Sequence, residues 1–99
     1  MELKTQDRIT LEKLEKYFAL SNKALQIIKS SIASGNEKKA KECIEMIEAY
    51  LKDSQHFKTK ADYINAFACI NYAHGWIDAS CRLGIFKVND NKLFAVNGK

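Results

Sequence analysis

Four polar side chains that could do chemistry stand close together in the sequence: Asn71, His74, Asp78 and Arg82. On an α-helix, at about 100° per residue, they fall within a strip about 80° wide. His74 and Asp78 are four residues apart, as are Asp78 and Arg82, so both pairs can touch. An aspartate beside a histidine can fix its tautomer and raise its pKa, which suits either a binding site or a general base. We therefore take these four residues as a candidate binding strip.

Three interpretations of this strip remain open. Polar groups between packed helices must be paired, and a network that fixes helix register needs no further function. The strip could instead bind a ligand or a partner, or take part in catalysis. In an antiparallel bundle it would face one of two polar groups on earlier helices, namely Asn22, Gln26 and Lys29, or Lys41, Glu45 and Glu48. A purely structural network is the more common reason for such a pattern.

Other kinds of site find little support. His74 and Cys81 lie about 10 Å apart along a helix, too far to ligate one zinc ion unaided. His56 has no partner at metal-ligand spacing, and no two of the three cysteines have the spacing of a zinc finger or a redox motif. Glycine-rich phosphate loops and nucleophile elbows are absent. We therefore assign no catalytic residue, metal or cofactor, and the sequence favours a binding module over an enzyme.

Three amphipathic stretches would position the strip. The first runs from about residue 10 to 34, with Thr10 as the N-cap and glycine near its end. Its seam alternates spacings of three and four: Leu11, Leu14, Phe18, Ser21, Leu25, Ile28 and Ile32. A second helix is expected at about 37–57 and a third at about 62–83, with Thr59 or Asp62 as the N-cap of the third. Short connections predict that consecutive helices run antiparallel.

The third stretch is apolar on nearly every side, which predicts a buried central helix. Ala68, Gly75 and Ala79 form a ridge of small residues on it. A glycine inside a helix costs about 1 kcal/mol relative to alanine. The ridge therefore predicts that another helix packs closely against it.

Beyond Gly84 the pattern changes to two short apolar runs separated by an Asx-rich turn. This predicts a β-hairpin or extended tail at about 85–96, with Phe86 and Phe94 anchoring it to the end of the bundle. The expected fold is thus a single all-α domain over residues 1–99. It is an antiparallel three-helix bundle with a short C-terminal hairpin.

Composition sets the class of protein and of partner. Hydrophobic residues make up 46% of the chain, proline is absent, and the net charge is +4. The lysines are interleaved with glutamates, so nucleic acid is not the expected partner. There is neither a secretion signal nor a run of about 20 apolar residues, which predicts a cytoplasmic protein without a membrane span. A protein partner or a homodimer is the expected association.

The third stretch also resembles a family signature. The segments Asp62-Tyr63-x-Asn65-Ala66, Tyr72-Ala73-His74-Gly75-Trp76-x-Asp78-Ala79 and Arg82-Leu83-Gly84 are similar to a small archaeal domain-of-unknown-function family (number three hundred fifty-seven). The resemblance covers most of the chain and implies a helical bundle, with no assigned activity or cofactor. The family motif includes the positions of His74, Asp78 and Arg82. Lys60-Ala61 stands where the family pattern has a glycine.

Taken together, these features predict a helical interaction or ligand-binding module of unknown specificity. The alternative is a domain that binds or processes nucleic acid through His74 and Arg82. Helical ribonucleases of that kind place the arginine before the histidine, whereas here His74 comes first. RNA affinity that falls with salt would support this alternative.

Overall fold

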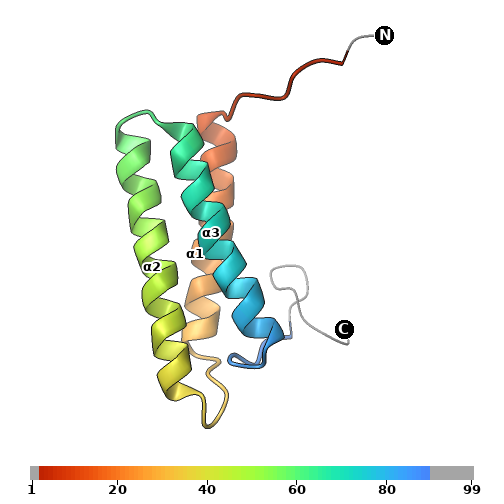
Figure 1. Cartoon of the computed structure of the whole chain (residues 1–99), viewed down its shortest axis with the longest axis vertical. Coiled ribbons are helices and arrows are strands. Elements are labelled where there is room, and N and C mark those ends of the chain that lie inside the picture. Colours follow the sequence, from red (N-terminus) through yellow and green to blue (C-terminus); the bar gives the residue numbers. More distant parts are fainter. Residues whose placement is uncertain (1–2, 90–99) are drawn as a thin grey trace.

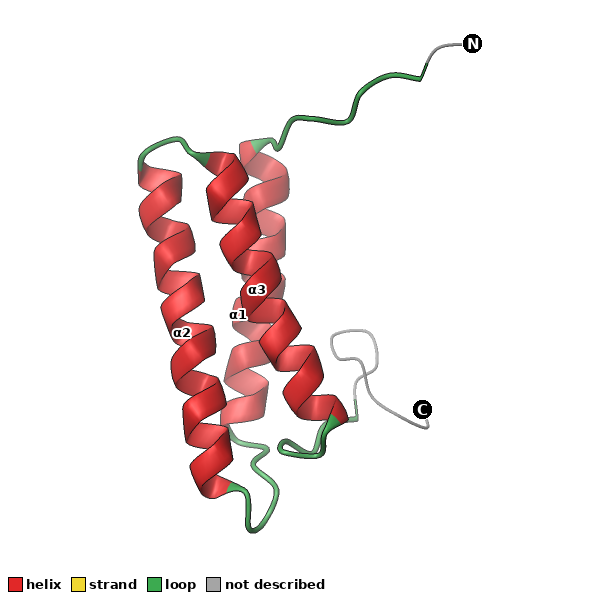
Figure 2. Ribbon diagram, in the orientation of Figure 1, coloured by secondary structure: helices red, strands yellow, loops and turns green. Residues whose placement is uncertain are grey.

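The computed structural model describes residues 3–89 and consists of three helices (Figures 1 and 2). They are α1 (Leu11–Lys29), α2 (Glu37–Thr59) and α3 (Tyr63–Arg82). Consecutive helices run antiparallel, so α1 and α3 are parallel, and α3 lies in front of α1 in Figure 1. The predicted all-α three-helix bundle is confirmed. None of the described helices combines the length and apolar character that crossing a membrane requires.

Side chains cap the helices at the two predicted N-termini. The Thr10 hydroxyl accepts a hydrogen bond from the Lys13 amide at 3.1 Å. The Asp62 carboxylate accepts one from the Asn65 amide at 3.2 Å. Each cap satisfies an amide that has no partner within the first turn of its helix. The sequence therefore located where α1 and α3 begin.

The core lies along the line where one face of each helix meets the other two. Its fully buried side chains include Ile28 from α1, Ile47 from α2, and Ile70 and Ile77 from α3. Small residues sit between them, since Ala24, Ala40, Ala66 and Ala73 are also completely buried. This alternation of large and small side chains lets the helices approach closely at native packing density.

Helix α3 is not buried on every side, so the prediction of a central buried helix is wrong. Ile64 is 65% exposed and Tyr72 is 62% exposed on its outer side. The predicted close approach at the small-residue ridge is also absent from the described structure. A Cβ atom placed on Gly75 would meet no atom within 4 Å. A three-helix bundle has only two neighbours for α3, and they cover one side of it.

The segment after α3 closes the lower end of the bundle. Ile85 and Lys87 exchange backbone hydrogen bonds with the loop after α1, through Ala33 (2.9 Å) and Ser31 (2.7 Å). Phe86 between them is 1% exposed and packs into the core, as predicted for an anchor. Because this loop pairs with the segment, α1 ends at Lys29, five residues before the predicted end.

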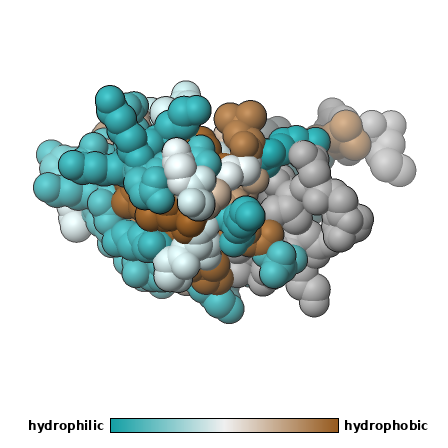
Figure 3. Space-filling view, turned by 90° about the horizontal axis from the view of Figure 1, so that it is seen from below, coloured by the Kyte–Doolittle hydropathy of each residue, from teal (hydrophilic) through white to brown (hydrophobic). Residues whose placement is uncertain are grey.

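The predicted C-terminal hairpin is not supported. Residues 85–88 make one isolated antiparallel bridge, Ile32 with Phe86, rather than a strand. The rest of the expected hairpin, including Phe94, lies outside the described residues. Seen from below, hydrophobic side chains reach the surface among hydrophilic ones at this end of the molecule (Figure 3). Instead of pairing in a hairpin, the backbone groups of residues 85 and 87 bond to the loop between α1 and α2.

The turn between α2 and α3 contains the one non-glycine residue with positive φ among the described residues. Ala61 has φ +58°, in the left-handed region that favours glycine. A Cβ atom in that region costs roughly 1–2 kcal/mol. The turn is held by hydrogen bonds from Ala61 and Asp62 to carbonyls at the end of α2.

We expect Phe86→Ala to destabilise the fold by about 3–5 kcal/mol, because it empties a buried site at the bundle end. Leu83→Ala, only three residues earlier but 77% exposed, should change stability by less than about 0.5 kcal/mol. Urea unfolding in dilute solution measures both. Equal effects would contradict the anchoring role of Phe86.

Ala61→Gly should stabilise the protein by about 1 kcal/mol, since glycine adopts the left-handed conformation without the Cβ penalty. The gain should appear as a higher urea midpoint with an unchanged slope. A matched glycine substitution at exposed Ala49 in α2 should instead cost about 1 kcal/mol. A loss of stability in Ala61→Gly would show that the turn carries no strain.

Candidate functional site

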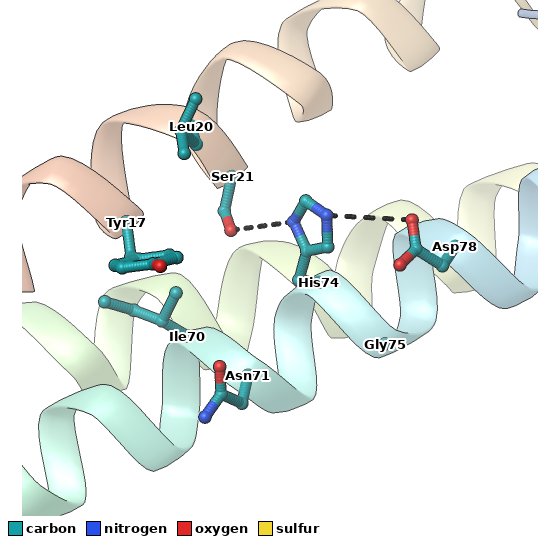
Figure 4. A pocket seen from close by; sticks show the side chains of 8 residues that line it. All are labelled: Tyr17, Leu20, Ser21, Ile70, Asn71, His74, Gly75 and Asp78. Carbon is teal, nitrogen blue, oxygen red and sulfur yellow. Dashed lines mark hydrogen bonds and ion pairs between the residues drawn. The ribbon is translucent and has the colours of Figure 1, made fainter. Parts of the chain in front are cut away.

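The predicted polar strip borders a pocket between α1 and α3 (Figure 4). We call it the α1/α3 pocket, and its volume is about 330 Å³. It is lined by Tyr17, Leu20 and Ser21 from α1 and by Ile70, Asn71, His74, Gly75 and Asp78 from α3. Apolar side chains form one part of the wall and polar groups the rest. The parallel course of α1 and α3 brings these two sets of residues together.

A chain of three polar groups crosses the pocket. Ser21 Oγ lies 3.0 Å from Nδ1 of His74, and Nε2 of the same ring lies 3.6 Å from a carboxylate oxygen of Asp78. The predicted contact between His74 and Asp78 along α3 is therefore present. The hydrogen bond to Ser21 fastens the imidazole to the neighbouring helix, so the ring is held from both sides.

The arrangement favours one tautomer of the neutral imidazole. A proton on Nε2 faces the Asp78 carboxylate and leaves Nδ1 as an acceptor, to which the Ser21 hydroxyl donates. In the protonated ring both nitrogens donate, and Ser21 becomes the acceptor. Ser21 can bond to either form because its hydroxyl both donates and accepts. The contact with Ser21 is thus kept whether or not the ring is charged.

The other two members of the strip lie in different settings. Asn71 lines the α1/α3 pocket with an exposed side chain, beside Ile70 and one turn before His74. Arg82 is exposed in the last turn of α3 and is not among the residues that line the pocket. Three of the four predicted residues therefore gather at one place, and Arg82 stands apart from it.

The Ser–His–Asp order resembles that of hydrolases, but its geometry does not suit nucleophilic attack. Ser21 is 1% exposed in the middle of α1, so a substrate carbonyl cannot approach its oxygen. The backbone amides around it already serve the helix and cannot form an oxyanion hole. The three groups are suited to holding a fixed polar surface inside the pocket.

Aromatic packing forms the end of the pocket nearest to the start of α1. Tyr17 meets Phe67 of α3 edge to face, with ring centroids 5.5 Å apart. The Lys13 ammonium lies 6.0 Å from the Tyr17 ring centroid and 5.8 Å from that of Phe67. This contact joins α1 to α3 one turn before Ser21.

Sequence reasoning missed the residues that α1 contributes. The sequence pattern places Ser21 in the apolar seam of the first helix. The polar partners that it predicts are either Asn22, Gln26 and Lys29 or Lys41, Glu45 and Glu48. A serine among leucines and isoleucines in a buried seam was the available signal, because a buried hydroxyl needs a partner. Tyr17 and Leu20 had no such signal, since they lie just outside the seam.

The cysteines do not add a reactive group to the site. Burial raises the pKa of Cys81 to about 11, with a smaller effect from Asp78. Burial also raises the pKa of Cys43 and of Cys69, with smaller effects from Glu42 and Asp53. Thiols of this kind are mostly protonated and unreactive near neutral pH. Among residues 3–89, no three His, Cys, Asp or Glu side chains gather as metal ligands would.

Comparison with known families matches the chain to a model described as a protein of unknown function (DUF357), over residues 16–86. The chain belongs to this family. The matched region spans α1 from Lys16 onward, all of α2 and α3, and Phe86, so it contains every residue of the α1/α3 pocket. No match was found among the curated proteins or the solved structures. The resemblance of the α3 segment to this family is thereby confirmed.

The bond between Ser21 and His74 can be measured by a double-mutant cycle of Ser21→Ala and His74→Ala. We expect a coupling free energy of about 1 kcal/mol in urea unfolding, the usual net value of a partly buried hydrogen bond. Asn22→Ala, next to Ser21 but exposed, serves as the control and should show no coupling to His74→Ala. A coupling free energy of zero between Ser21→Ala and His74→Ala would show that the hydrogen bond between the two side chains does not stabilise the fold.

Proposed function

We propose that the chain is a non-enzymatic binding module whose site is the α1/α3 pocket. The observation that carries this proposal is the pocket itself, about 330 Å³ and lined by both apolar and polar side chains. Its volume lies at the lower end of the range for small-molecule sites. A site of this size takes a single ring or short chain with one polar end.

The polar wall favours a ligand whose polar end donates hydrogen bonds. Asp78 is the one lining residue that carries a formal charge whatever the state of His74. The Asn71 amide, two turns earlier on α3, can donate and accept at the other end of the polar wall. An amine or an amide therefore suits the pocket better than a carboxylate, which Asp78 would repel. The apolar part of the ligand would rest on Tyr17, Leu20 and Ile70.

A pre-arranged polar wall supports binding over a purely structural network. A network that only locks two helices would be closed off from solvent, whereas the side chains of His74 and Asp78 are 31% and 36% exposed. Holding the imidazole from both sides reduces the ordering cost when a ligand binds. No observation favours the nucleic-acid alternative in the same way, since Arg82 does not line the pocket that holds His74.

Benzylamine, benzamide and benzoate test the proposal as matched probes in NMR titrations of ¹⁵N-labelled protein. Benzylamine and benzamide should shift the amides of residues lining the pocket, and benzoate should bind at least several-fold more weakly. Asp78→Asn should weaken benzylamine several-fold and leave benzamide nearly unchanged, because only the charge is removed.

Asp53 is an exposed residue of α2. Asp53→Asn is the matched control and should bind all three probes as the wild type does. The proposal fails if the amine and the amide cause no shifts at the pocket. It also fails if Asp78→Asn and Asp53→Asn behave alike towards benzylamine.

A further inference from the structure

The outer side of α3 is apolar and carries almost no charge. Among its exposed side chains are Ile64 and Tyr72, with Leu83 just beyond the helix end. Apart from His74, its 20 residues include one acidic and one basic side chain, Asp78 and Arg82. By helix geometry this side points about 160° away from the buried face. Large apolar side chains exposed along one side of a helix are common at interaction sites.

The spacing along this outer side is that of a two-helix seam. The seam residues are Asn65, Ala68, Tyr72, Gly75, Ala79 and Arg82, with spacings that alternate between three and four. This is the heptad pattern by which one helix packs along another. One seam side chain is held in place within the single chain, because the Tyr72 ring stacks on that of Tyr50 in α2 with centroids 5.4 Å apart.

The seam is also symmetric about its midpoint, between residues 73 and 74. In an antiparallel pair of identical helices, Tyr72 would lie level with Gly75, and Ala68 with Ala79. The Tyr72 ring of one copy would thus meet Gly75 of the other, which has no side chain. A Cβ atom at Gly75 would have no neighbour within 4 Å in the single chain. The flanking apolar residues match too, since Ile64 would lie level with Leu83. Positions spaced by three and four are symmetric in any such seam, so what favours a second copy is the match of large with small residue types across the twofold axis.

Charges complement one another in the same arrangement. Asp62 stands at the N-terminus of α3 and Arg82 in its last turn. Antiparallel pairing brings each Arg82 level with the first turn of the other helix, within one turn of its Asp62. The opposed helix dipoles add to this attraction. Each end of the pair would therefore hold the Arg82 of one copy and the Asp62 of the other, which are opposite in charge.

We propose that α3 pairs antiparallel with α3 of a second copy of this chain, through the seam from Asn65 to Arg82. The pairing buries the apolar outer side that the three-helix bundle leaves uncovered. This seam faces away from the core, and Gly75 is the one residue that it shares with the α1/α3 pocket. The dimer does not depend on the function proposed for that pocket.

Sedimentation velocity over a range of concentrations tests the pairing. Wild type should sediment as a dimer at high concentration, whereas Gly75→Glu should weaken dimerisation at least tenfold. A Cβ atom at this position has no neighbour within 4 Å in the single chain, and the substitution replaces the poorest non-proline helix former with a good one. Its thermal unfolding in dilute solution should therefore be unchanged or slightly raised. Ala49 is an exposed residue of α2, and the control variant Ala49→Glu should dimerise with the same dissociation constant as the wild type.

Cross-linking tests the orientation. When Ala68→Cys and Ala79→Cys proteins are mixed under mild oxidation, peptide mapping should find disulfides between positions 68 and 79. Each variant alone should cross-link poorly at its new cysteine. A wild type that stays monomeric at high concentration overturns the proposal, as does a Gly75→Glu protein that dimerises normally. Preferred 68–68 and 79–79 links would show a parallel pair and overturn it equally.

Discussion

The rotation of α3 about its own axis is the constraint on which the rest of this structure depends. Four fully buried or nearly buried residues, Ala66, Ile70, Ala73 and Ile77, face α1 and α2 along one line. Burying this stripe is favourable in proportion to the apolar area removed from water. Because the stripe can face the core in only one rotation, it also decides where every other residue of α3 points.

That rotation creates two surfaces of different character. On the side towards α1 it places His74 and Asp78 beside the pocket, where Ser21 reaches the imidazole. On the side away from the core it leaves Ile64 and Tyr72 exposed. The first surface is concave with polar groups held in place, which suits a small ligand. The second is apolar and self-complementary, which suits another helix.

The bundle end is held by contacts between segments far apart in the sequence. Phe86 fills the lower core, and its neighbours bond to the loop between α1 and α2. This closure ties the end of α3 to the end of α1, so the two helices that form the pocket are joined below it. Lys58 and Glu15 pair at 2.9 Å between α2 and α1, but such partly exposed ion pairs contribute little to stability. Apolar packing therefore contributes more than this surface ion pair to holding α1 in the bundle.

The sequence by itself determined what depends on neighbours along the chain. The three helices, the caps at Thr10 and Asp62 and the contact between His74 and Asp78 follow from local spacing, because residues three and four apart share a helix face. Only the tertiary structure decided which faces are buried. The sequence does not distinguish an apolar residue that packs against a helix from one that faces solvent. The sequence pattern therefore wrongly predicts that the sides of α3 carrying Ile64 and Gly75 are buried. The choice of Ser21 as the partner of His74, and the early end of α1, required knowing how distant segments pack together.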